Sequence, residues 1–211
     1  VAANTVLRAR ILGADTAPVL AEPIAATGGS LAAGTYYYRV AAVMASGTDN
    51  ALGETLPSDE VSIRANEEGL VTLSWSVTVP ADVDHYRVYR SPDPNLASGS
   101  EVLLADNVQA TTYEDDGETP PSSTDVPRTT GSVGEWMVVA ELAQARFDAA
   151  ATAVRIDDAH AYLYVAGGRS GPGDGDVLRS SEWAELTANG GALVGDWQAG
   201  PDMPLARAEH G

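Results

Sequence analysis

The sequence predicts an all-β protein built from two modules, and three observations carry this prediction. Short runs of alternating apolar and polar residues recur along the chain and are separated by turns rich in Gly, Asn, Asp and Pro. Almost no stretch has the 3.6-residue periodicity of an amphipathic helix. A motif in the last third of the chain recurs at an offset of 61 residues, which is typical of a unit that needs neighbours to bury its apolar face.

The composition narrows the classes of function. A chain of 211 residues is long enough for one large domain or two ordinary domains, each with a sizeable core. The net charge of −18 comes from 30 acidic and 12 basic residues, and every basic residue is Arg. The missing Lys, with abundant Ala, Gly and Val, indicates the coding bias of a GC-rich bacterium. An acidic surface repels phosphate backbones and anionic lipids, so we expect neither nucleic-acid nor membrane-surface binding.

The sequence contains no Cys, which excludes disulfides, thiolate zinc sites and thiol nucleophiles. No apolar run approaches the roughly 20 residues that a membrane-spanning helix needs. The chain begins with Val1 and shows no signal peptide, so we expect a processed N-terminus or a piece of a longer chain. The acidic charge suits a protein kept soluble outside the cell, and the absence of Cys is compatible with export, so we expect an extracellular or cell-surface location, or one on a virion or appendage.

The first module is predicted at residues 17–118, after an N-terminal stretch, 1–16, whose single strand ends a preceding domain or begins this one. Its clearest strand is 36–43, where Tyr36, Tyr38, Val40 and Ala42 share one face. An edge strand is expected near 18–27 because Pro stands near both ends. Further strands are predicted at 57–64, 70–77, 84–90, 101–105 and 111–114. This spacing of short strands and turns predicts a β-sandwich.

Several of these residues resemble a fibronectin type III module, a sandwich of the immunoglobulin-like class. Residues 31–42 look like that family's strand F, with Tyr36 at the place of its tyrosine corner. Leu73-Ser74-Trp75 looks like its strand B with the buried Trp, and residues 86–91 look like its strand C. The F-like strand precedes the B-like and C-like strands, a permuted order that we associate with repeated modules of bacterial surface proteins and phage tail proteins.

Residues 119–134 separate the two modules. They hold three prolines among hydroxyl residues and glycines, which predicts an extended linker and a domain boundary.

The second module is predicted at residues 135–211, and the repeat lies within it. Trp136 corresponds to Trp197, Leu142 to Met203, and Ala145-Arg146 to Ala206-Arg207. Strands are predicted at 135–142, 149–156, 162–167, 182–187 and 194–199. The apolar run 161–168 ends in the pair Gly167 and Gly168.

This pattern resembles kelch repeats, whose fold is a β-propeller. The resemblance implies that the last four strands form one blade and that residues 203–211 begin the next. It implies that Gly167 and Gly168 end the second strand where the chain is crowded, and that Arg146 and Arg207 anchor the connections between blades. We expect Trp75, Trp136 and Trp197 to be core residues, and Trp183 to be either core or an exposed platform for a sugar. A closed propeller has about four to eight blades, so we expect the chain to continue past Gly211 or neighbouring subunits to complete the ring.

The sequence offers few candidates for catalytic, cofactor-binding or metal-binding residues. The sequence has no nucleophile elbow, phosphate loop or dinucleotide fingerprint. His85, His160 and His210 lack zinc-ligand spacing, and the crosslinked Tyr–Cys cofactor of kelch-type copper oxidases needs a Cys. Asp174 and Asp176 lie in a Gly-rich loop that can hold Ca²⁺, with a solvated loop as the alternative. We therefore predict no catalytic residue, no cofactor-binding residue, and no cofactor other than this calcium ion.

These observations lead to a hypothesis of a non-catalytic, extracellular structural or adhesive protein of a bacterium. The sandwich would be a spacer that presents the kelch propeller for protein or glycan binding on a cell surface, a fibre or a phage-tail-like appendage. The alternative is an accessory part of a secreted propeller enzyme, a carbohydrate hydrolase or oxidase, whose catalytic residues lie beyond Gly211. A third hypothesis is a structural subunit whose blade is completed by a neighbouring chain through strand addition.

Overall fold

A computed structural model describes residues 3–48, 50–121, 124–187 and 193–208 of the chain. It confirms the all-β prediction, because the strands form four antiparallel sheets and the helical segments of the described residues are three-residue 3-10 turns. The chain divides into a central unit, Ile11–Glu135, and a terminal unit, Val1–Arg10 with Trp136–Gly211. Among the described residues, no helix has the length and apolar character that a membrane crossing requires.

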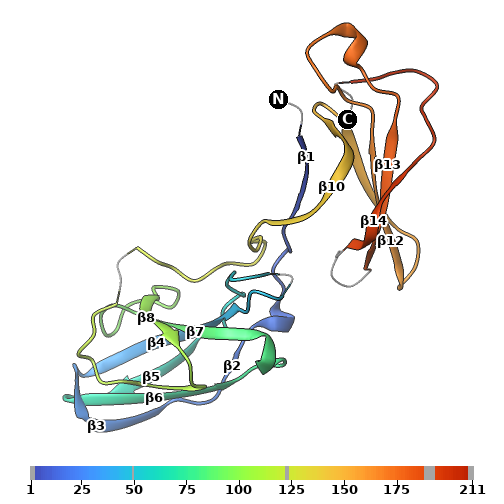
Figure 1. The fold of residues 1–211 in the computed structure, drawn as a ribbon. Helices are drawn as coiled ribbons and strands as arrows, with labels where there is room; N and C mark the ends of the chain where they lie inside the picture. The colour runs from blue at the N-terminus through green and yellow to red at the C-terminus, as the bar shows by residue number, and fades with distance from the viewer. Residues whose placement is uncertain (1–2, 49, 122–123, 188–192, 209–211) are drawn as a thin grey trace. The chain divides into compact units, whose positions relative to one another are not determined.

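The central unit contains two sheets that share one core. One sheet has the order β5-β4-β7-β8, and in the other β2, β3 and β9 all pair with β6 (Figure 1). Its strands are β2 (Val19–Leu20), β3 (Ile24–Leu31), β4 (Gly34–Met44), β5 (Val61–Ala65), β6 (Gly69–Ser76), β7 (Val83–Arg90), β8 (Val102–Val108) and β9 (Thr112–Asp115). Two 3-10 turns, η1 (Ala14–Thr16) and η2 (Pro80–Asp82), lie before β2 and β7.

The alternation read from the sequence determines which side chains enter this core. Tyr36, Tyr38, Val40 and Ala42 of β4 are all buried in one apolar cluster, as their period of two predicts. The cluster also takes alternate residues of the neighbouring strands, which are Val71, Leu73, Trp75, Tyr86 and Val88. Side chains from both sheets therefore exclude water together, which is the main stabilising contribution in a β protein of this size.

The predicted linker, 119–134, lies in the central unit. The Leu103 amide donates to the Asp125 carbonyl at 2.8 Å, and the Leu12 amide donates to the Ser132 carbonyl at 3.0 Å. Ile11 and Val133 form an isolated antiparallel bridge. The two units follow one another in sequence at Glu135 and Trp136, at the end of this segment.

The terminal unit contains two further sheets. A four-stranded antiparallel sheet follows chain order, β11-β12-β13-β14, and the N-terminal strand β1 pairs with β10 (Figure 1). Its strands are β1 (Ala3–Arg8), β10 (Met137–Arg146), β11 (Ala150–Arg155), β12 (His160–Ala166), β13 (Ser181–Thr187) and β14 (Leu193–Ala199), with a 3-10 turn η3 (Asp174–Asp176). Leu142, Val165, Ala184 and Trp197 form its small core. Residues 203–208, predicted to begin another repeat, contain no strand.

Candidate functional site

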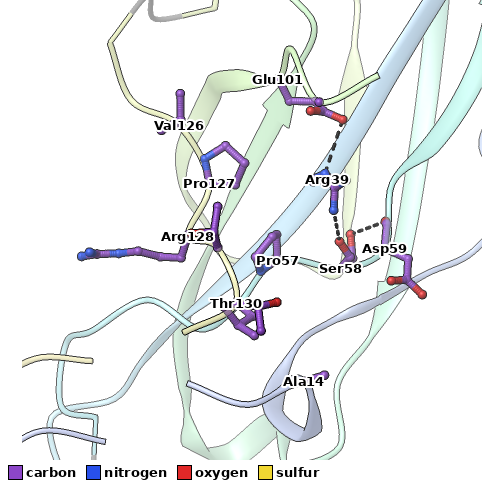
Figure 2. A pocket seen from close by; sticks show the side chains of 13 residues that line it. Ala14, Arg39, Pro57, Ser58, Asp59, Glu101, Val126, Pro127, Arg128 and Thr130 are labelled. Atoms are coloured by element: carbon purple, nitrogen blue, oxygen red, sulfur yellow. Dashed lines mark hydrogen bonds and ion pairs between the residues drawn. The ribbon is translucent and has the colours of Figure 1, made fainter. Parts of the chain in front are cut away.

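A cavity of about 590 Å³ in the central unit is the candidate binding site. Arg39 comes from the middle of β4, Ser58 and Asp59 precede β5, and Glu101 directly precedes β8. Figure 2 shows Pro57 and Pro127 among the apolar residues of the cavity, with Arg39 between Glu101 and Ser58. The remaining lining residues are Ala14, Leu56, Gly99, Val126, Arg128, Thr129 and Thr130.

Arg39, which lines this cavity, lies within reach of two carboxylates. Its Nη1 donates to the Ser58 carbonyl at 3.2 Å. Its Nε lies 3.4 Å from Oε1 of Glu101, and its Nη2 lies 3.7 Å from Oε2 of Glu60. One guanidinium therefore faces two carboxylates, and Glu101 is only 2% exposed to solvent.

The two carboxyl groups have opposite pKa shifts. Burial, followed by its hydrogen bond with Glu60, raises the pKa of Glu101 to about 7. Burial alone raises the pKa of Glu60, but hydrogen bonds from Glu101, Ser98 and Gly99 outweigh it and lower that pKa below its usual value. Glu101, which lines the cavity, thus exchanges its proton near neutral pH, and the neighbouring Glu60 carboxylate stays ionised.

The cavity has the chemistry of a site for a small polar ligand with an apolar face. The prolines supply apolar surface, and Arg39, Asp59 and the hydroxyl groups of Thr129 and Thr130 supply polar groups. Among the described residues, no three His, Cys, Asp or Glu side chains are grouped to hold a metal ion.

Sequence reasoning missed this cavity and also missed a buried ionic network in the core of the same unit. Arg90 donates through Nη1 to both carboxylate oxygens of Asp115, at 2.8 and 2.7 Å. The Tyr38 hydroxyl donates to the same carboxylate at 2.7 Å, and the Gly117 amide donates to it at 3.1 Å. All three side chains of this network are buried, and burial raises the pKa of Tyr38 far above its usual value.

The residues behind the fibronectin type III resemblance lie in the same core. The Tyr36 hydroxyl donates to the Ala32 carbonyl, four residues upstream, at 3.2 Å. The Trp75 ring packs edge-on against Tyr86, with centroids 5.3 Å apart and planes at 70°. Tyr36 also receives the Arg90 guanidinium over its ring face, 5.4 Å from the centroid.

Arg146 is buried in a socket in the terminal unit. Its Nη1 donates to the carbonyls of Gly167 and Ser180, at 2.9 and 3.1 Å. Its Nη2 donates to Oε1 of Glu182 at 2.6 Å, and the Ala143 amide donates to the other oxygen of that carboxylate at 2.6 Å. This buried pair joins β10 to β13, which belong to different sheets.

The Gly pair after β12 occupies a crowded left-handed turn. Gly167 and Gly168 have φ values of 66° and 87°, and a Cβ on Gly168 would lie 2.6 Å from the Phe147 carbonyl oxygen. The Gly168 amide donates to the Arg207 carbonyl at 2.8 Å, and the Arg207 amide donates to the Leu178 carbonyl at 3.1 Å. The two Ala-Arg copies of the repeat therefore approach the same turn, and the second Arg is exposed.

The tryptophans divide between core and surface. Trp75 and Trp197 are buried, as predicted, and the half-buried Trp183 packs 5.8 Å from Tyr162. The prediction that Trp136 is a core residue is wrong, since it is 65% exposed. It precedes β10, which pairs with β1 in a two-stranded sheet, and it borders an apolar cavity of about 270 Å³ lined also by Val6, Leu7, Arg8, Ala9, Leu163, Leu186 and Leu193.

The predicted calcium loop is organised by its own backbone. Asp174 and Asp176 lie in η3, and Oδ2 of Asp176 accepts the Gly173 amide at 2.8 Å. Asp174 is exposed. The two carboxylates supply few of the six to eight oxygen ligands that Ca²⁺ takes, and calcium binding here stays a prediction.

The histidines make local contacts with carboxylates. His85 lies 2.8 Å from Asp84 and 3.1 Å from Asp106, and His160 lies 2.8 Å from Asp157 in the turn before β12. His210 lies outside the described residues.

Comparison with other proteins gives no relative. No protein-family model matches the chain, and no curated protein or solved structure matches it significantly.

Proposed function

We propose that the chain is a non-catalytic extracellular structural or adhesive protein, in which the central unit is a fibronectin type III-like sandwich that serves as a spacer. The terminal unit is the part presented to a protein or glycan partner, on a cell surface, fibre or phage-tail-like appendage. The acidic composition supports a soluble, exposed protein that repels nucleic acid and anionic lipid.

The observation that carries this proposal is the Arg146 socket. Arg146, from the first copy of the repeat, donates to the Gly167 carbonyl and to Glu182. The backbone of the second copy contacts the same turn, because the Gly168 amide donates to the Arg207 carbonyl. A four-stranded meander with such junctions is what the kelch resemblance implies for one blade. Successive blades that meet at such junctions form a rigid platform, and the loops between strands are then free to bind a partner.

The central unit supports the spacer role. Its two sheets share one core, and Tyr36 makes the backbone hydrogen bond expected of a tyrosine corner. A rigid β module of this kind resists extension and keeps the presented unit away from its attachment point.

The test is a binding screen of the intact chain against a glycan array and against immobilised surface proteins of bacterial cells. The Asp174→Ala variant changes the loop between β12 and β13, and Glu67→Ala in an exposed turn of the central unit is the matched control. We expect a ligand whose binding the first variant weakens and the second leaves unchanged. Turnover of an array glycan by the intact chain would refute the non-catalytic reading and favour the accessory-enzyme alternative.

A further inference from the structure

Glu60 and Glu101 meet at one loop of the central unit. Glu60 directly precedes β5, Glu101 directly precedes β8, and both approach Arg39 of β4. Oε1 of Glu60 accepts the Ser98 hydroxyl at 2.6 Å, and its Oε2 accepts the Gly99 amide at 2.8 Å. Glu60 is therefore the anchor that ties the loop between β7 and β8 to the rest of the unit.

The charges at this anchor do not balance when both carboxyl groups are ionised. Arg39 faces two carboxylates at 3.4 and 3.7 Å, and its described hydrogen bond goes to the Ser58 carbonyl instead. Oε1 of Glu101 is buried and accepts no hydrogen bond from the described part of the chain. An ionised Glu101 is unfavourable because its buried Oε1 has only the ion pair with Arg39 at 3.4 Å, whereas a protonated Glu101 can donate to Glu60 and leave one negative charge for one guanidinium.

We propose that Glu60 and Glu101 form a proton-operated clasp, which ties the loop 91–101 to the central unit while Glu101 is protonated and loosens it when Glu101 ionises. Gly99 and Glu101 belong to this loop and also line the 590 Å³ cavity, so the clasp controls access to the candidate binding site. The other charged groups that line the cavity are Asp59 and Arg128.

The direction of the effect follows from proton linkage. Glu101 has a higher pKa in the folded protein, about 7, than its usual value of 4.5, so the folded state holds this proton more tightly than the unfolded state does. Its stabilising contribution is complete below the unfolded value and is lost as the pH rises through about 7. The opposite shift of Glu60 keeps the acceptor of the clasp ionised throughout this range.

The test is amide hydrogen exchange of the full chain from pH 5 to pH 9, corrected for the intrinsic pH dependence of exchange. From pH 5 to about pH 7 we expect the protection of residues 91–101 to fall by up to about tenfold per pH unit and to level off above pH 7, because only in this range does the closed loop hold the Glu101 proton more tightly than the open loop. In Glu101→Gln the side-chain amide donates to Glu60 at every pH, so its protection stays flat. Strand β6 is the internal control, and Asp59→Asn, which removes an exposed carboxylate at the same cavity, keeps the wild-type profile. The same pH profile in wild type and Glu101→Gln would overturn the proposal.

A second measurement decides the matter if Glu101→Gln does not fold. Carbon-13 NMR of the side-chain carboxyl of Glu101 in the wild-type chain reports its protonation directly. A titration midpoint near pH 7 supports the clasp, and a midpoint in the usual range of a Glu carboxyl overturns it.

Discussion

Removing Asp115 is the sharpest perturbation of the central unit. Asp115 ends β9 and binds Arg90 of β7, so its carboxylate joins the two sheets that share the core. In Asp115→Ala the Arg90 guanidinium stays buried without a counter-ion, and the Tyr38 hydroxyl loses its acceptor. The structure therefore predicts a loss of stability far larger than that of an ordinary surface substitution.

The magnitude follows from these two orphaned groups. Breaking a buried ion pair by removing one partner costs about 3–5 kcal/mol. An unsatisfied buried hydroxyl costs about 1–3 kcal/mol, and because the groups are in contact the two costs do not simply add. We expect a total loss of about 4–6 kcal/mol in the free energy of unfolding of the central unit, which is a large part of the roughly 5–15 kcal/mol of a typical domain.

The assay is native-state hydrogen exchange of the β4 and β6 amides, which reports the opening of the central unit without requiring the whole chain to unfold in one step. The matched control is the double variant Arg90→Met with Asp115→Leu, which removes both charges and is expected to lie within about 2 kcal/mol of wild type. A loss below about 1 kcal/mol in Asp115→Ala would refute the reasoning, since leaving a buried guanidinium without a counter-ion lowers the free energy of unfolding by more than that.

Three further outcomes follow from the same contacts. Arg146→Ala leaves Glu182 buried with only backbone donors, so we expect the terminal unit to lose about 3 kcal/mol in urea unfolding, and a loss near zero would contradict the socket. Trp197→Ala removes a buried ring and should cost about 3–5 kcal/mol, whereas the exposed Trp136→Ala should change stability by about 0.5 kcal/mol or less, and equal losses would contradict this assignment. Tyr36→Phe removes the hydrogen bond from the Tyr36 hydroxyl to the backbone, so we expect the central unit to lose about 1 kcal/mol of stability, measured by hydrogen exchange. An unchanged stability would contradict the tyrosine-corner assignment.

The strands were predictable because alternation is a local property of the sequence. Tyr36, Tyr38, Val40 and Ala42 enter the core together, since neighbouring positions of a strand point to opposite faces. The repeat pointed to Arg146 because the Ala-Arg pair recurs at one offset, and the kelch resemblance pointed to the Gly pair. What the repeat could not supply was burial at Trp136, because burial depends on the sheet beside a residue and not on its place in the repeat.

The polar sites were not predictable as pairs, because their members lie far apart in sequence. Arg90 and Asp115 are 25 residues apart, and Tyr38 and Asp115 are 77 apart. A partial signal was present: Arg90 stands two positions after Val88 on the inward face of β7, so alternation places a charge in the core. An inward charge requires a counter-ion, but only the register of β6 with β9 identifies it as Asp115.

Each unit thus has, among its described residues, a buried arginine–carboxylate pair that joins strands of different sheets. Arg90 and Asp115 connect β7 to β9, and Arg146 and Glu182 connect β10 to β13. Backbone hydrogen bonds fix the strands within a sheet, whereas apolar contacts between sheets have little directional preference. A buried guanidinium that binds fixed acceptors does have a directional preference, because its planar donors match a carboxylate or carbonyl in few orientations. We infer that these pairs contribute less to total stability than to the angle and register at which the sheets of each unit pack.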